Sequence, residues 1–597
     1  MEPRAARRGG RRNALCRRDG RSGRRPRGDD APQSRPAPDV DPGVVRPVRR
    51  RRHRGIWHRP APPSRRPRHR QGLSVGPYAL CRRSRPENGR RPQGLHPDGL
   101  PPRPARTAAM KRLSLLPILS LALAFAPAAA QNAAAPPPES AIALPAPITT
   151  PLAGTFNGRK VRYDARVEPI EATGTDGKTT ARLVAISYVA KDAKPDRPVI
   201  FAFNGGPISP SYILHMGALG PKRVAVPNDI AVPAASFQLV DNPYTLLDVA
   251  DLVFFDPAGT GFSRLAPGVD PQSQFGNVAD SRQLASLVIE WTKAHGRTGA
   301  PLYLIGESYG TLRAPEAAHQ LQAAGVDVAG IVLLGQAVNI VEYAQRRGNI
   351  ISYAVSMPTL AAIAWSHGKA DAKGRSFDRF MADVRDFAAN EYLPVLFQGD
   401  TAPAQSQRTV AAKLQEYTGL PADWYLGHQL RITKVDYQRQ LLPGQRLGTN
   451  DARYAGPADG PDPFDVVPDR YAELFRHYLE SDLKAGAVGD YVTQSPFRGG
   501  LNGWDWGPNK SPFGDWPYGR AIGELFEKNP GFRLFVANGW TDTQTTVGAM
   551  DYLVAQSGWP RARLRTATYQ GGHMPYTIEA SLKAFTDDVR AMVERKW

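Results

Sequence analysis

Five short runs of β-branched and aromatic residues recur along the chain, and each contains or ends near a glycine. They are RPVIFAFNGG (197–206), ADLVFFDPAG (250–259), PLYLIGES (301–308), AGIVLLGQ (329–336) and FRLFVANG (532–539). The runs are apolar throughout rather than at every second position, which is typical of strands that are covered on both faces of a parallel sheet. Helical patterns at 279–296 and 314–325 lie between several of these runs, and this alternation predicts an α/β fold.

The fourth and fifth runs are separated by a long helical and irregular segment, residues 337–520. We expect an insertion of that size at the carboxyl ends of the strands to lie above the site as a cap. A separate domain is the alternative. If the segment is a cap, it divides the α/β core into two parts of the sequence, residues 151–336 and 521–597.

The positive charge of the chain is confined to its first part. The net charge of +22 would suit a protein that binds polyanions. However, residues 1–109 contain 30 arginines, no lysine and 8 acidic residues, whereas the remainder has 47 basic and 47 acidic residues. The segment is rich in Pro and Gly and has no helical or strand periodicity, so we expect a disordered extension. Its composition is also typical of GC-rich DNA translated in a frame that does not encode a protein. We therefore expect translation to start at Met110.

Residues 110–130, MKRLSLLPILSLALAFAPAAA, have the pattern of a secretory signal peptide. Lys111 and Arg112 precede an apolar stretch that is too short for a stable membrane anchor, and small residues follow it. A Pro/Ala-rich linker is expected at 131–150. The exported chain would then begin near Gln131, in the periplasm or outside the cell. Since both cysteines and the excess charge precede it, we expect no disulfide and no nucleic-acid partner.

The motif GESYG, residues 306–310, places Ser308 between a predicted strand and a predicted helix. This is the context of a nucleophile elbow, in which flanking glycines permit a sharp turn and the serine hydroxyl projects above the sheet. A hydroxyl is a weak nucleophile at neutral pH and needs a base that a carboxylate orients. The alternative is a serine that only occupies a tight turn.

The acid and the base are expected after Ser308, since an α/β-hydrolase has the order serine, acid, histidine. Asp542 follows the run 532–539, and His573 lies in the glycine-flanked loop YQGGHMPY after the apolar run 563–569. Asp542 could instead cap a helix, and His573 could be a packed loop histidine. The other acids considered are Asp251 and Asp551. The other histidines after Ser308, outside its own helix, are His367, His428 and His477.

The motif FNGGP, residues 203–207, follows an earlier strand and offers unhindered backbone N–H groups. The negative oxygen of a tetrahedral intermediate needs such donors already in place, and the N–H of Tyr309 beside the nucleophile would supply a second one. A plain turn at the strand end is the alternative, because N-G is a strong turn signal. The sequence has no metal-type Cys/His cluster, and we expect no metal and no cofactor.

Taken in their order along the chain, these motifs resemble the serine carboxypeptidase family of α/β-hydrolases. The resemblance rests on FNGGP, a GP pair at 220–221, NPYTLLDVADLVFFDPAGTGFS (242–263), GESYG, NGWTD (538–542) and GGHMPY (571–576). Segments similar to HMGALGP and LAAIAW occur in bacterial members. The likeness extends from about Pro151 to the C-terminus.

The resemblance implies an α/β-hydrolase fold and a set of site residues for a peptide substrate. The catalytic triad would consist of Ser308, Asp542 and His573. The oxyanion hole would consist of the N–H groups of Gly206 and Tyr309. The C-terminal carboxylate of the peptide would bind at Asn204, Gly205 and Glu307. A carboxyl group must be protonated to donate to another carboxylate, so we expect an acid-favouring exopeptidase that releases C-terminal amino acids through an acyl-enzyme.

The chain departs from the family pattern at several positions. Ala202 replaces a tryptophan, ISPS (208–211) replaces GCSS, and Ala218 replaces a second acidic residue of the eukaryotic members. The disulfides of the family are absent as well. The triad does not depend on these positions, but carboxypeptidase specificity does. Esterase, amidase or acyltransferase activity on the same machinery is therefore an alternative, and a non-catalytic binding protein on the same fold is another.

Overall fold

A computed structural model of the chain describes residues 146–507 and 514–597, which belong to one compact unit. The expected N-terminal extension and signal peptide lie outside the described residues, as does most of the expected linker. The first strand, β1 (Ile148–Phe156), begins within the last three residues of that linker. None of the helices in the described ranges combines the length and the apolar character that crossing a membrane requires.

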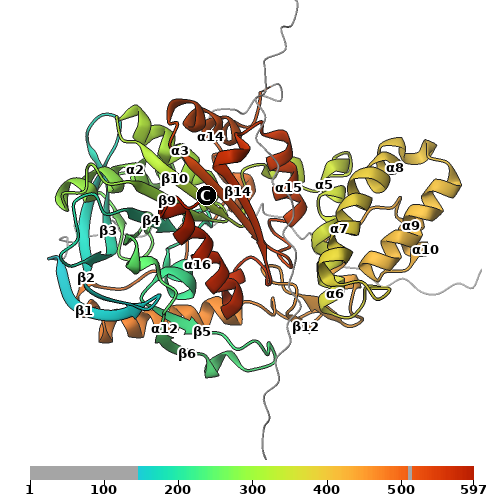
Figure 1. Ribbon diagram of the computed structural model, residues 1–597, viewed down its shortest axis with the longest axis horizontal. Helices are drawn as coiled ribbons and strands as arrows, with labels where there is room; N and C mark the ends of the chain where they lie inside the picture. Colours follow the sequence, from blue (N-terminus) through green and yellow to red (C-terminus); the bar gives the residue numbers. More distant parts are fainter. Residues whose placement is uncertain (1–145, 508–513) are drawn as a thin grey trace, which may run out of the picture. The chain divides into compact units, whose positions relative to one another are not determined.

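The centre of the described unit is a 10-stranded, mainly parallel sheet (Figure 1). Its parallel strands, in spatial order, are β7 (Asp251–Phe254), β4 (Val199–Phe203), β9 (Leu302–Glu307), β10 (Val328–Leu334), β13 (Arg533–Gly539) and β14 (Leu564–Tyr569). The sheet continues beyond β7 with the antiparallel strands β3 (Thr179–Ala190), β2 (Arg159–Thr173) and β1, and β8 (Arg264–Leu265) pairs with β3. This is the α/β-hydrolase architecture that the sequence predicts.

The parallel strands β7, β4, β9, β10 and β13 are mostly apolar because both of their faces are covered, whereas the edge strand β14 has exposed residues. In β4, Val199, Phe201 and Phe203 point into one hydrophobic cluster, whereas Ile200 and Ala202 point into the other. The first face is covered by α2 (Asn277–Ala294), α3 (Gly310–Ala323), α14 (Pro517–Lys528) and α15 (Val547–Gln556). The second face is covered by α12 (Val466–Ser481) and α16 (Glu579–Val593).

The segment 337–520 does not form a single layer. Its first part contains α4 (Ile340–Tyr343), α5 (Ile350–Ala354), α6 (Met357–Ser366), α7 (Phe377–Phe387), α8 (Leu393–Gln398), α9 (Ala404–Thr418), α10 (Ala422–Gly427) and α11 (Lys434–Gln440). The helices α5 to α10, yellow to orange in Figure 1, form a group in which α5 and α6 lie nearest to α15. There the Thr546 hydroxyl donates to the Val355 carbonyl (3.2 Å). By contrast, α12 belongs to a layer that covers the sheet, although it falls within the expected cap, and α14, which also covers the sheet, has only residues 517–520 within that cap.

Candidate active site

Ser308 lies in the turn between β9 and α3, with a backbone φ of +59°. This left-handed conformation is strained for a residue with a side chain and is typical of a nucleophile elbow. Glycines make the turn possible: a Cβ at Gly306 would come within 2.2 Å of the Gly310 carbonyl oxygen, and a Cβ at Gly310 within 3.1 Å of the Asn204 carbonyl oxygen. The Ser308 N–H donates to Leu334 at the end of β10 (2.9 Å). Ser308 is therefore fixed at the carboxyl ends of the parallel strands.

Asp542 and His573 are hydrogen-bonded, with 2.7 Å between Oδ2 of the carboxylate and Nδ1 of the imidazole. Asp542 follows β13 and is completely buried. Its Oδ1 accepts from the N–H groups of Gln544 (2.8 Å) and Thr545 (3.0 Å), and its Oδ2 also accepts from the Thr545 hydroxyl. A carboxylate with this many donors is held in one orientation. The predicted acid and the predicted base are therefore in contact.

The loop that carries His573 depends on its two glycines. Gly571 has a φ of +109°, and a Cβ at Gly572 would come within 2.2 Å of the Asn450 carbonyl oxygen. The N–H of His573 donates to that same carbonyl (2.6 Å). Burial lowers the pKa of His573, but the neighbouring carboxylates, Asp542 foremost and then Glu307, together outweigh this effect, so the pKa lies above its usual value. The imidazole is thereby prepared to accept a proton.

Ser308 and His573 lie at neighbouring strand ends. Leu334 accepts the N–H of Ser308, and the next residue, Gly335, lies against the imidazole: a Cβ there would be 3.0 Å from Cε1 of His573. Within the described residues, the Ser308 hydroxyl makes no hydrogen bond. The predicted proton-transfer chain is therefore present between Asp542 and His573 but open between His573 and Ser308. Such bonds are often long in substrate-free enzymes and shorten when the substrate binds.

The N–H groups of Gly206 and Tyr309, the predicted oxyanion donors, belong to two segments in direct contact. A Cβ at Gly205 would lie 2.4 Å from the Tyr309 nitrogen and 2.9 Å from Cβ of Ser308. The Gly205 carbonyl accepts from Ser209 (3.1 Å), and since the C=O and N–H of a trans peptide point in opposite directions, the N–H of Gly206 points away from Ser209. Across 146–507 and 514–597, no turn or loop carbonyl accepts from either predicted donor.

The predicted carboxylate-binding residues Asn204 and Glu307 form a buried network beside the nucleophile. Asn204 Nδ2 donates to Glu307 Oε1 (2.9 Å), and its Oδ1 accepts from the Leu214 N–H (2.9 Å). The Tyr576 hydroxyl donates to Glu307 Oε2 (2.6 Å). Burial raises the pKa of Glu307 to about 7. The carboxyl group is thus protonated in a large fraction of molecules at mildly acidic pH.

The chain matches a known family through the segment that carries the elbow. Residues 185–387 match the family model described as serine carboxypeptidase. The chain is a serine carboxypeptidase-like hydrolase. The matched segment includes Asn204, Glu307 and Ser308 but ends before Asp542 and His573, whose assignment rests on the geometry described above.

Comparison with curated proteins finds no match. Among solved structures, the chain is similar to Kex1(delta)p, a prohormone-processing carboxypeptidase from Saccharomyces cerevisiae, at 12% identity and a TM-score of 0.43, over 72% of this chain and 92% of that one. It is also similar to the Pyrococcus furiosus esterase Pf2001 (9% identity, TM-score 0.29, 72% and 90% covered). A third is a proline iminopeptidase from Mycobacterium smegmatis (11% identity, TM-score 0.30, 72% and 98% covered). Similarity at these levels does not discriminate between substrates.

The other candidate acids and histidines of this hydrolase have other partners. Asp251 is paired with two arginines at the start of β7, and Asp551 on α15 is paired with an arginine (2.7 Å). Nε2 of His367 lies 2.7 Å from a backbone carbonyl oxygen, whereas His428 and His477 are exposed. Within the described residues, no three His, Cys, Asp or Glu side chains are grouped as metal ligands.

Two contacts of the hydrolase site were not predicted from the sequence. Thr545 bonds to Asp542 and lies 3.3 Å from Nδ1 of His573, and Tyr576 bonds to Glu307. The spacing of both residues from the predicted triad could have indicated these contacts. Thr545 follows the acid by three positions, a spacing typical of side-chain turns, and Tyr576 follows the histidine by three positions in GGHMPY.

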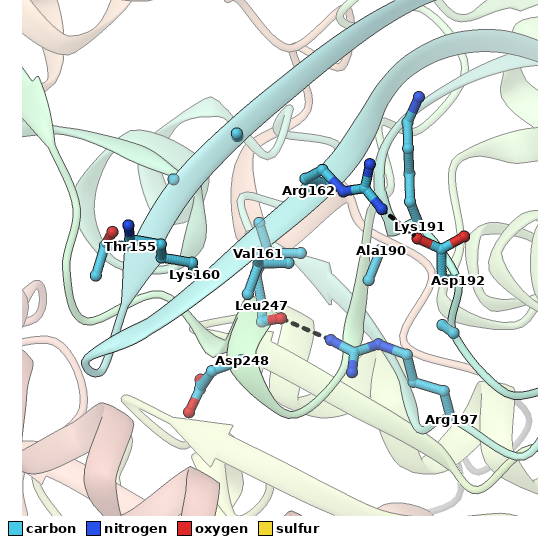
Figure 2. A pocket seen from close by; sticks show the side chains of 13 residues that line it. Thr155, Lys160, Val161, Arg162, Ala190, Lys191, Asp192, Arg197, Leu247 and Asp248 are labelled. Carbon is cyan, nitrogen blue, oxygen red and sulfur yellow. Dashed lines mark hydrogen bonds and ion pairs between the residues drawn. The ribbon is translucent and has the colours of Figure 1, made fainter.

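A hollow of about 780 Å³ lies between β1, β2 and the loop before β4 (Figure 2). Arg197 in this hollow donates to the Leu247 carbonyl (2.6 Å), and Arg162 is paired with Asp192 (2.7 Å). Arg197 precedes β4, so the hollow lies at the amino ends of the parallel strands. Because Ser308 lies at their carboxyl ends, the hollow is separate from the candidate active site.

Proposed function

We propose that the protein is a serine carboxypeptidase that releases C-terminal amino acids from peptides, and that it is a bacterial-type member of that group. The observation that carries the proposal is the position of the Asn204–Glu307 pair. Glu307 directly precedes the nucleophile in the chain, and Asn204 directly precedes the glycines of the FNGGP turn. A site for a carboxylate would therefore lie next to the bond to be cleaved.

In the proposed reaction, the Ser308 hydroxyl attacks the carbonyl carbon of the last peptide bond while His573 takes its proton. Asp542 stabilises the imidazolium that forms, and the N–H groups of Gly206 and Tyr309 stabilise the negative oxygen. His573 then gives the proton to the nitrogen of the leaving amino acid, which leaves an acyl-enzyme on Ser308. A water molecule, activated by His573, hydrolyses this ester and restores the serine.

Asn204 and Glu307 both retain hydrogen-bond capacity for a substrate carboxylate. The amide nitrogen of Asn204 carries two hydrogens, and one of them is given to Glu307. A protonated Glu307 supplies an O–H donor, and its pKa of about 7 keeps it protonated in mild acid. When this carboxyl ionises, it repels a substrate carboxylate. The proposed enzyme therefore loses affinity for peptides as the pH rises through neutrality.

The proposal is tested by mass spectrometry of a peptide incubated with the purified protein. A peptide with a free C-terminus is expected to lose single residues from that end. The same peptide with an amidated C-terminus is the matched control and is expected to be cleaved much more slowly, while the Ser308→Ala variant is expected to release nothing from either. Equal cleavage of the amidated peptide, or cleavage at internal bonds, would refute the exopeptidase proposal.

An esterase, amidase or acyltransferase is the second candidate. It is favoured by Ala218, which is completely buried and has no carboxyl group to offer to a substrate. Faster turnover of simple esters than of blocked dipeptides would support this candidate over the first.

We also propose that the protein is exported to the periplasm or secreted. The support is the signal-like sequence that begins at Met110 and ends at Ala130. Amino-terminal sequencing of the protein from its native cells is expected to start near Gln131. A start upstream of Met110 would contradict the proposal.

A further inference from the structure

Arg313 is a completely buried cation that the proposed reaction does not use. It lies on α3, five residues after Ser308. Its Nε donates to Oδ2 of Asp280 on α2 (2.8 Å), and neither side chain of this pair is exposed to solvent. Removing two charges from water costs free energy that their mutual attraction often does not offset. A contribution to stability is therefore a weak explanation for a fully buried ion pair.

The guanidinium of Arg313 also contacts both segments that carry the predicted oxyanion donors. Its Nη1 donates to the carbonyl oxygen of Asn204 (2.6 Å), the residue that precedes the glycines of the FNGGP turn. Its central carbon lies 5.2 Å from the ring centre of Tyr309, within the range of a cation–π contact. The rings of Phe203 (5.4 Å) and Phe255 (5.3 Å) surround the same carbon.

We propose that Arg313 is a positioning residue for the oxyanion hole, because it holds the FNGGP turn and Tyr309 at a fixed separation. The inference rests on the proposed acyl-transfer reaction. By fixing the carbonyl of Asn204, Arg313 orients the peptide unit that leads into Gly205, and Gly205 packs directly against the Tyr309 nitrogen. The two N–H groups can then reach one oxygen without reorganisation, which is the source of oxyanion stabilisation.

The competing role for Arg313 is a structural one, in which it only neutralises Asp280. The single variant Arg313→Met cannot separate the two roles, because it leaves a buried carboxylate unpaired. The double variant Arg313→Met/Asp280→Leu removes both charges and keeps the site apolar, so it is expected to fold. It still lacks the hydrogen bond to Asn204.

The variant Arg313→Lys provides an independent test. It keeps a positive charge beside Asp280, but a lysine lacks the planar fork that bonds Asp280 and Asn204 in the present geometry. The matched control is Arg297→Met, which removes another buried arginine bonded to an aspartate (3.0 Å). Arg297 follows α2 at the amino ends of the strands and has no place in the proposed reaction.

The measurement is the rate at which a fluorophosphonate probe labels Ser308, together with kcat and KM for a peptide and the midpoint of thermal unfolding. We expect the labelling rate and kcat to fall about 10–100-fold in the double variant and in Arg313→Lys, with KM unchanged, since loss of an oxyanion contact acts on the transition state. The control is expected to be labelled at the wild-type rate. Wild-type labelling in a folded double variant or in Arg313→Lys would overturn the inference.

Labelling requires the nucleophile and the oxyanion hole but no peptide. If the wild-type protein reacts with the probe but cleaves no peptide, the proposed substrate is wrong while the role of Arg313 is still tested. If peptides are cleaved and the folded variants are labelled at the wild-type rate, only the role of Arg313 fails.

Discussion

Glu307 connects the proposed substrate to the pH dependence of the protein. Its pKa is raised from 4.5 to about 7, mainly because burial disfavours the charge. A carboxyl group whose pKa is raised by folding makes its full contribution to stability at pH values below its pKa in the unfolded state. This contribution is lost as the pH rises through its pKa in the folded state. The affected window is therefore about pH 4.5 to 7.

The Glu307→Gln variant is expected to remove this pH dependence. The wild type should lose stability as the pH rises, whereas the variant should not lose this part of it. At 1.36 kcal/mol per pKa unit, the free energy of unfolding of the variant minus that of the wild type should therefore be larger at pH 8 than at pH 5 by roughly 2–3 kcal/mol. Urea denaturation at the two pH values measures the difference. The KM of the variant for a peptide substrate should also not rise from the lower pH to the higher one.

Tyr576→Phe is the matched variant for this prediction. The hydrogen bond from Tyr576 lowers the pKa of Glu307, so its loss should raise that pKa and extend tight peptide binding to higher pH. A pH profile of KM that neither substitution changes would contradict the role assigned to Glu307.

Asp542 provides a second prediction at the residue scale. Asp542→Asn keeps the size of the side chain but replaces an acceptor by an amide that can favour the wrong tautomer of His573, so kcat should fall by about 10⁴. Steady-state kinetics on the folded variant measures the change. A loss of less than tenfold would show that Asp542 is not the orienting acid.

The sequence predicts residues of the site that belong to short motifs and misses those defined by contacts between distant segments. Ser308 and His573 stand in glycine-flanked motifs whose backbone geometry has few solutions. The bond between Tyr576 and Glu307 joins residues 269 positions apart, and the one between Arg313 and Asn204 spans 109 positions. No local pattern encodes such a pairing, so it appears only when the sheet brings the strand ends together.

At the scale of elements, the parallel strands were predictable and the antiparallel ones were not. The strands β4, β9, β10 and β13 are buried on both faces and therefore read as continuous apolar runs. In β1, exposed residues alternate with half-buried ones, and β2 carries charged residues along its length. Their positions depend on pairing with β3 more than on their own composition. The helices α2 and α3 were predicted with later starts, at 279 and 314 rather than at Asn277 and Gly310.

The loop after β14 carries His573, and its position depends on close packing at Gly572. Gly572 is packed against residues 450 and 451 so closely that a Cβ would lie 2.2 Å from a backbone carbonyl oxygen. Gly572→Ala should displace the loop that carries His573 and lower kcat by at least about tenfold, as small shifts of catalytic groups do. The control is Gly299→Ala. Like Gly572, Gly299 has no left-handed φ, but no atom lies within 4 Å of the added Cβ. If both variants retain full kcat, the tight packing of the loop is irrelevant to catalysis.

At the scale of the whole molecule, the described unit depends on its core rather than on crosslinks. Both cysteines of the chain, Cys16 and Cys81, precede the described residues. Two hydrophobic clusters cover the faces of the sheet instead. A protein consisting of residues 131–597 is therefore expected to have the same kcat/KM as the full chain, and its thermal midpoint should not change when a reducing agent is added. A tenfold lower kcat/KM would show that the first 130 residues contribute to activity.

The proposed reaction depends on Ser308 as the nucleophile and on His573 as the base that activates it. The most direct measurement is to label the protein with a fluorophosphonate, digest it, and locate the adduct by tandem mass spectrometry. We expect one adduct, on Ser308 within GESYG, and its loss in His573→Ala. An unlabelled Ser308, or an adduct on another serine in a protein that is active, would contradict it.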